Sequence, residues 1–214
     1  MITEVLPGIH HWSVKWPDDF SLESYLLHTD DGDVLIDPMD YSVGVSEVVA
    51  IIVTRIAHER SARVFASESG APIYLPELDA GRANGPESFE TIAHGDELPG
   101  GLKALEIKGV DGWELALLSP VHDGTLFVGD ALGTMGKWTP GEIPPGGRRP
   151  VGGPIGGHPR MHPHPSQTLT HLLDYEFQNL LTGHGPPYLG YAKQRLAELI
   201  ERDAVSLRES EAPQ

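Results

Sequence analysis

The run VVAIIVT at residues 48–54 places the strongest constraint on how this chain folds. Its first six residues are apolar, and five of those six are β-branched. Such a run is typical of a short strand covered on both faces, because a strand with one exposed face would carry a polar residue at every second position. The chain is therefore expected to contain a buried sheet.

Short strands and tight turns surround this run. SYLLHT (24–29) and DVLIDP (33–38) flank the turn Asp30-Asp31-Gly32, which is a hairpin signal. A short helix is expected after residue 54, because small and apolar residues recur at helical spacing from Ala62 to Ser69 and Gly70 is a suitable stop. Further strands are predicted at 71–77, 102–109, 113–120, 125–130 and 179–183, and helices at 166–175 and 191–205.

The composition narrows the possible chemistry. The 214 residues include no cysteine, which excludes disulfides, thiolate catalysis and cysteine-based zinc sites. Metal ligands must therefore come from Asp, Glu and the 11 histidines. The start has no basic segment followed by an apolar run, and no stretch reaches the roughly 20 apolar residues of a membrane helix. We expect a cytoplasmic protein that does not bind a membrane.

The charge is strongly acidic, with 31 acidic against 15 basic residues and a formal net charge of −16. This balance argues against nucleic-acid binding, which needs a basic surface to displace counterions. The acid excess is explained either by solubility alone or by a salt-rich host. A small-molecule substrate or ligand is the expected partner.

Residues 133–166 form a segment in which 17 of 34 residues are Gly or Pro. A structureless segment of this length is usually a lid, a binding loop or a linker. Only about 50 residues follow it, too few for an independent core. We therefore expect a single domain over residues 1–205, with a loop at 133–166 and a disordered tail at 206–214.

Two potential ligands stand at the ends of apolar strands. Asp130 ends the strand in FVGDALG, and His184 follows the strand in LLTGHGPP. A buried strand needs neither residue at its end, and both have glycine neighbours that allow close approach to a ligand. Each alone is better explained as a turn Asp or a capped His, but the pair indicates a site.

With these motifs in view, the chain resembles the metallo-β-lactamase-fold hydrolases, and in particular the branch of hydroxyacylglutathione hydrolase (glyoxalase II). The segments SYLLHTDDGDVLIDP, VVAIIVT, GAPIYLPE, GDELPGGLKALEI, TLFVGDALG and LLTGHGPP follow one another in the order of that family. The resemblance covers about residues 4–200, apart from the long loop. It implies an α/β (α+β) fold, a four-layer αββα sandwich of two mixed sheets with helices outside.

The family binds two metals through a T-H-x-H-x-D-H motif, a histidine in a GH turn, and the residues that correspond to Asp130 and His184. Counted without gaps from Thr54, the four motif positions here are Arg55, Ala57, Glu59 and Arg60, which would leave the site unable to bind metal. With a two-residue deletion, His58 takes the last motif position instead. The turn histidine is replaced by Val110.

The shortened motif predicts a degenerate site in which one metal is held by His58, Asp130 and His184. Asp130 is also the candidate catalytic residue, which orients the water. The implied function is hydrolysis of an ester, thioester or phosphoester by metal-activated water, with zinc as the first choice of metal and iron or manganese as alternatives. The other reading is an inactive protein of the same fold that holds no metal and binds a small ligand or a protein partner.

Other polar residues carry weaker predictions. Arg148, Arg149, His158, His162 and His164 lie in the Gly/Pro-rich segment and are candidates for substrate binding. The three histidines are more typical of a solvated loop, because prolines keep them from sharing one helix face. His10 and His11 are interpreted as structural.

Overall fold

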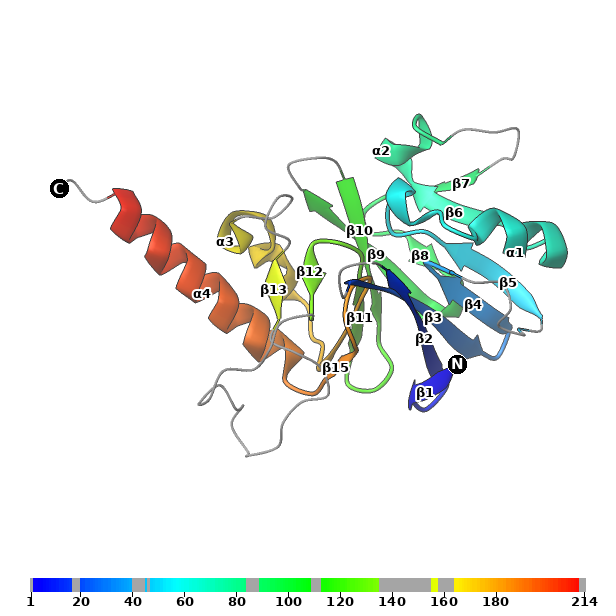
Figure 1. The fold of residues 1–214 in the computed structure, drawn as a ribbon, viewed down its shortest axis with the longest axis horizontal. Helices are drawn as coiled ribbons and strands as arrows, with labels where there is room; N and C mark the ends of the chain where they lie inside the picture. Colours follow the sequence, from blue (N-terminus) through cyan, green and yellow to red (C-terminus); the bar gives the residue numbers. More distant parts are fainter. Residues whose placement is uncertain are drawn as a thin grey trace.

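The computed structural model describes residues 2–16, 20–39, 45, 47–83, 89–108, 113–134, 155–157 and 164–211. Its strands form two mixed sheets that pack face to face (Figure 1). The first has the strand order β1-β2-β3-β4-β5-β6-β7. These strands are β1 (Thr3–Leu6), β2 (Ile9–Trp16), β3 (Phe20–Thr29), β4 (Gly32–Ile36), β5 (Val48–Ile52), β6 (Ile73–Pro76) and β7 (Phe89–Ile92).

The second sheet has the strand order β15-β14-β11-β10-β9-β8. Its strands are β8 (Glu97–Leu98), β9 (Leu102–Lys108), β10 (Trp113–Ser119), β11 (Thr125–Val128), β14 (Asn179–Thr182) and β15 (Tyr188–Leu189). A separate small pair joins β12 (Leu132–Gly133) to β13 (Gly156–Gly157), so part of the Gly/Pro-rich segment returns to the end of β11. Residues 135–154 lie outside the described part of the chain.

Three hydrophobic clusters fill three interfaces between layers. In β4, Val34 and Ile36 face the second sheet, whereas Leu35 faces the outside, as the two-residue period of a strand requires. The outer face of the first sheet is covered by Phe65 of the helix that follows β5. The outer face of the second sheet is covered by Leu196 of the C-terminal helix. Four layers result, which confirms the predicted αββα architecture.

The main helices lie on opposite sides of the two sheets (Figure 1). They are α1 (Ala62–Ser69), α2 (Glu77–Ala80), α3 (Pro165–Thr168) and α4 (Ala192–Glu211), and the short 3₁₀ turns are η1 (Ile56–His58), η2 (Pro99–Gly101) and η3 (Thr170–Asp174). α1 ends at Gly70, the predicted stop, whose φ of 76° is the left-handed conformation common at the end of a helix. Among the described residues, no helix is both long and apolar enough to cross a bilayer.

Two predicted elements differ from the structure. The helix expected at 166–175 is two short turns, α3 and η3, because the chain bends at Leu169 between them. α4 continues to Glu211, so residues 206–211, which we expected in a disordered tail, are helical. Residues 212–214 lie outside the described part of the chain.

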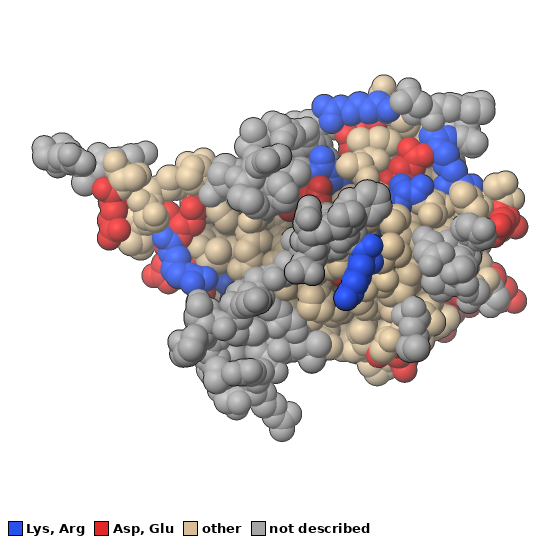
Figure 2. Space-filling view, in the orientation of Figure 1, with Lys and Arg blue, Asp and Glu red and all other residues tan. Residues whose placement is uncertain are grey.

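Charged side chains are interspersed on the face shown in Figure 2. In the described part of this face, Lys and Arg are scattered, some of them next to Asp and Glu, and they form no continuous basic area. This distribution agrees with the acidic composition.

Candidate metal centre

Three residues from different parts of the chain meet at one edge of the two sheets. His58 ends η1 after β5, Asp130 follows β11 by two residues, and His184 follows β14 by two residues. Because β11 and β14 are parallel neighbours, their carboxyl ends lie at the same edge. The Oδ1 atom of Asp130 lies 2.9 Å from Nε2 of His58 and 2.7 Å from Nε2 of His184. The three residues predicted as ligands are therefore brought together.

The imidazole of His58 is enclosed by two glycines. A Cβ atom added to Gly183 would lie 2.8 Å from Cε1 of His58, and one added to Gly129 would lie 3.2 Å from the same atom. These are the glycines of the GD and GHG sequences. They are required because the ring occupies the space of their side chains.

Asp37 holds the other nitrogen of His58. Its Oδ2 lies 2.8 Å from Nδ1 of His58, and its carboxylate also accepts hydrogen bonds from the backbone and the hydroxyl of Thr54 at 2.8 and 2.7 Å. Asp37 follows β4 with φ of 47°, a conformation that Asp tolerates better than most residues. Burial alone would lower the pKa of His58, but the carboxylates of Asp37 and Asp130 outweigh it and raise the pKa to about 9.

His184 is oriented by a backbone carbonyl. Its Nδ1 lies 3.0 Å from the carbonyl oxygen of Ser21, at the start of β3. A ring nitrogen that donates to a carbonyl leaves the opposite nitrogen, here Nε2, to face a metal. This contact crosses from one sheet to the other.

Asp130 is held through its Oδ2 atom and through the backbone turn that carries it. Its Oδ2 accepts from Nη1 of Arg55 at 2.7 Å. The backbone N–H groups of Asp130 and Ala131 donate to the buried carboxylate of Glu114, which fixes the turn after β11. Burial would raise the pKa of Asp130, but the imidazoles of His184 and His58 lower it well below its ordinary range. Burial and the nearby Asp130 raise the pKa of Glu114 to about 7.

The donor set fits a divalent transition metal. One ligand atom from each of His58, Asp130 and His184 lies within 4.8 Å of the others. Although both imidazoles are close to Oδ1 of Asp130, this buried oxygen has no hydrogen bond of good geometry to the described residues. Two imidazoles and one carboxylate are a common ligand set for zinc and iron. An ion would occupy the lone pairs that Oδ1 leaves unused.

Both ways of counting the motif are visible in the structure. His58 reaches Asp130, as the shortened motif predicts, and Ala57 is exposed to solvent. Arg55, the first position of the ungapped count, also reaches Asp130, but as an ion pair. Arg60 donates to the backbone carbonyls of Glu23 and Asp37.

The weaker candidates lie elsewhere. His164 stands at the start of α3 and pairs with Asp203 of α4 at 3.4 Å. His11 pairs with the buried carboxylate of Glu23 at 2.5 Å. The remaining candidates and the residue at the turn-histidine position lie outside the described residues: Arg148, Arg149, His158, His162 and Val110.

Several residues of the centre were not singled out from the sequence. Asp37 carries the same signal as Asp130, an acid at the end of a buried strand, but DVLIDP was interpreted only as part of a hairpin. Glu114 is a lone acid inside the apolar strand β10, which is also a usable signal. The pairing of Arg55 with Asp130 has no signal in the sequence, because 75 residues separate them.

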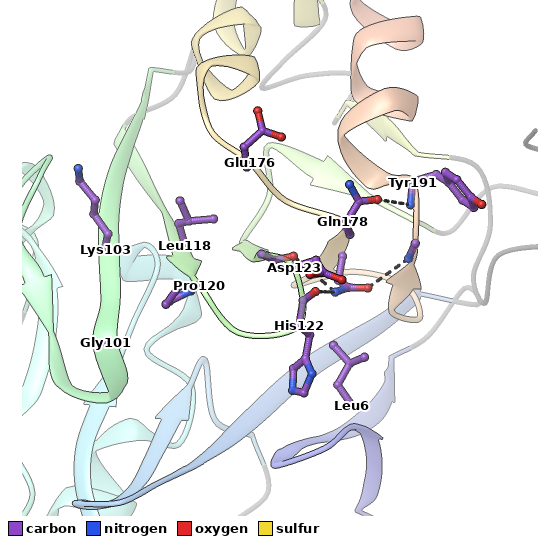
Figure 3. A pocket seen from close by; sticks show the side chains of 13 residues that line it. Leu6, Gly101, Lys103, Leu118, Pro120, His122, Asp123, Glu176, Gln178 and Tyr191 are labelled. Atoms are coloured by element: carbon purple, nitrogen blue, oxygen red, sulfur yellow. Dashed lines mark hydrogen bonds between the residues drawn. The ribbon is translucent and has the colours of Figure 1, made fainter.

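A large open cavity of about 1230 Å³ lies at the opposite end of the second sheet. Leu6, His122 and Tyr191 border it (Figure 3). Its lining includes Gly124 and Asn179, which lie where β11 and β14 begin, whereas the candidate ligands follow the ends of these strands. This cavity is therefore separate from the candidate metal centre.

Comparison with solved structures identifies the fold. A beta-lactamase domain protein from Burkholderia ambifaria superposes with a TM-score of 0.64 and 14% identity, over 98% of this chain and 76% of that one. A metallo-beta-lactamase family protein from Thermus thermophilus gives 0.61 and 18%, over 96% and 82% of the two chains. A mutant flavo di-iron protein from Thermotoga maritima gives 0.62 and 16%, over 95% and 61%.

No sequence-family model matches this chain, and no curated protein sequence does so either. The structural similarity defines the class: the chain has the metallo-β-lactamase fold. In this chain the fold carries one His-Asp-His cluster, within the part that the structure describes, at the edge where the two sheets meet.

Proposed function

We propose that this protein is a mononuclear metallo-hydrolase that acts on an ester, thioester or phosphoester, with one divalent metal held by His58, Asp130 and His184. The observation that carries the proposal is the convergence of these three side chains, with the buried Oδ1 of Asp130 between the two imidazoles. Zinc is the preferred metal, with iron and manganese as alternatives that the same donors accept.

The chain's own residues prepare the ligands. Asp37 binds Nδ1 of His58, and the carbonyl of Ser21 binds Nδ1 of His184, so that both Nε2 atoms face Asp130. When bound, a divalent ion lowers the pKa of a water ligand and polarises the substrate oxygen. Asp130 is proposed to act both as a ligand and as the residue that orients the water.

The position of Arg55 favours a site for one metal rather than two. Its guanidinium lies against Oδ2 of Asp130 at 2.7 Å, whereas the two imidazoles share the other oxygen of that carboxylate. A second cation bound to Oδ2 would meet this fixed positive charge. The same charge would stabilise an oxyanion that develops on a substrate next to the metal.

Metal content tests the proposal most directly. Protein purified without chelator is analysed for zinc, iron and manganese, next to His184→Ala and the control His164→Ala, whose histidine pairs with α4 away from the centre. We expect about one metal per chain in the wild type and the control, and none in His184→Ala. Chromogenic ester, thioester and phosphoester substrates then identify the reaction. A wild type without stoichiometric metal would overturn the proposal.

The inactive binding protein is the second candidate, and one observation favours it. With its raised pKa, protonated His58 forms a cation between the carboxylates of Asp37 and Asp130, so the cluster is balanced without a metal. A metal must displace that proton in order to bind Nε2. The second candidate is preferred if neither metal nor hydrolysis is found.

A further inference from the structure

We propose that Glu23 is a positioning residue of the metal centre, which fixes the segment carrying His184 relative to the segment carrying His58. The inference rests on the metal-binding function proposed above. Glu23 lies on β3 and is buried, with 1% of its surface exposed. It does not reach the candidate ligands itself, and its effect passes through the residues that it contacts.

The main chain of Glu23 joins both ligand segments. Its N–H donates to the carbonyl of Gly183 at 3.0 Å, immediately before His184. Its carbonyl accepts from Nη1 of Arg60 at 2.7 Å, two residues after His58. One residue of the first sheet therefore contacts the backbone next to one ligand and the side chain next to another.

The side chain of Glu23 acts on His184 through Ser21. Its carboxylate accepts a hydrogen bond from the hydroxyl of Ser21. The backbone carbonyl oxygen of Ser21 in turn lies 3.0 Å from Nδ1 of His184 and accepts its hydrogen bond. The other carboxylate oxygen pairs with Nε2 of His11 at 2.5 Å. A buried carboxylate is costly unless it is paired, and here both oxygens have partners. Removing the Glu23 carboxylate would free Ser21, whose carbonyl orients His184.

Two substitutions and a matched control separate positioning from general stability. Glu23→Ala removes every side-chain contact, whereas Glu23→Gln keeps the shape and an acceptor for Ser21. The control is Asp33→Ala, which removes the partner of His28, another histidine–carboxylate pair at 2.5 Å. His28 also lies on β3, but on the opposite face and at the far end of the strand.

The first measurement uses metal-free protein and records solvent exchange of the His184 ring Nδ1 proton by ¹⁵N-resolved NMR. His184→Gln assigns the signal. We expect slow exchange in the wild type, Glu23→Gln and Asp33→Ala, and markedly faster exchange in Glu23→Ala. Unchanged exchange in a folded Glu23→Ala variant would overturn the inference.

The second measurement is zinc affinity by competition with a chelator. We expect a loss of about 10–100-fold for Glu23→Ala, the usual effect of removing a residue that supports a ligand. Glu23→Gln should restore most of the affinity, and Asp33→Ala should match the wild type. An equal loss in Asp33→Ala would contradict positioning. If the wild type binds no zinc, the proposed function fails, and the exchange measurement still decides the role of Glu23.

Discussion

At the scale of single residues, the centre depends on glycines, which have no side chain, as much as on the candidate ligands. Gly183 is the clearest case, because its absent Cβ leaves the space that Cε1 of His58 fills. The neighbouring carbonyl of Gly129 closes the same space, at 3.2 Å from that Cβ position. The backbone has little freedom to move away, since Gly183 is hydrogen-bonded to Val128 through its N–H and to Glu23 through its carbonyl.

Gly183→Ala should therefore displace His58 and weaken zinc binding by about 10–100-fold, as for the loss of a ligand's support. Zinc affinity measured by chelator competition checks this result. The control is Gly81→Ala, because Gly81 has a helical φ of −69° and no atom lies within 4 Å of the position that an added Cβ would take. A Gly183→Ala variant with wild-type zinc affinity would show that the His58 imidazole can bind zinc from another position.

Arg55→Gln removes the guanidinium that lies against Asp130. We expect stronger zinc binding, because a fixed positive charge beside the carboxylate repels the incoming cation. Affinity is again measured by chelator competition, with Arg82→Gln as the control, since Arg82 is largely exposed and pairs with Asp79. Weaker binding would mean that Arg55 matters more for holding Asp130 in place than for its charge.

The residues of the centre that could be predicted from the sequence are those whose positions follow from local patterns. Asp130 and His184 were predictable because each ends a strand, and the two strands are parallel neighbours. His58 required a choice of alignment, and the buried ring beside Asp130 supports that choice. The hydrogen bonds of Asp37 and the ion pair of Arg55 were not predictable, since they join residues that are distant in the sequence.

At the scale of elements, the sequence pattern predicted α1 and the strands β3–β6, β9–β11 and β14, but it missed β1, β2 and β7 and failed for the helix at 166–175. That segment is held by tertiary contacts rather than by its own helical pattern. Asp203 of α4 accepts hydrogen bonds from the backbone N–H of Ser166 at 3.0 Å and from its hydroxyl at 2.5 Å. The first turn of α3 is thus stabilised by Asp203, which lies 37 residues further along the chain.

Asp203→Ala should lower the free energy of unfolding by about 1.5–3 kcal/mol, the usual range for hydrogen bonds to a charged group. Urea denaturation measures the change, with Glu201→Ala on the exposed face of α4 as the control. An effect no larger than that of the control would show that α3 is held by packing alone.

The effect of Asp203 should also depend on pH. Burial would raise the pKa of Asp203, but hydrogen bonds from Ser166 lower it below the ordinary value. A carboxylate with a lowered pKa stabilises the fold above its unfolded pKa, and this stabilisation is lost as the pH falls through the folded value. The difference between wild type and Asp203→Ala should be full at pH 7 and shrink in acid.

At the scale of the whole molecule, the strand patterns predicted only buried sheets, and the four layers were predicted through the family resemblance that the order of the motifs implies. The three hydrophobic clusters lie between these layers. The sequence did not show how the sheets are joined at their edge. Tyr25 of β3 donates to the carbonyl of Thr182 at 2.8 Å, and the N–H of Leu115 donates to the carbonyl of Thr54 at 2.9 Å. These polar contacts cross the interface beside the candidate metal centre.

A bound metal would join the same two sheets, because His58 follows a strand of the first sheet while Asp130 and His184 follow strands of the second. Zinc at about 100 times its dissociation constant should therefore stabilise the protein by about 2.7 kcal/mol and raise its melting temperature. Scanning calorimetry after EDTA treatment, with zinc then added back, measures the shift. Magnesium should give a smaller shift, because it prefers oxygen ligands. His184→Ala should show no zinc-dependent shift, and an equal shift in that variant would place the ion elsewhere on the molecule.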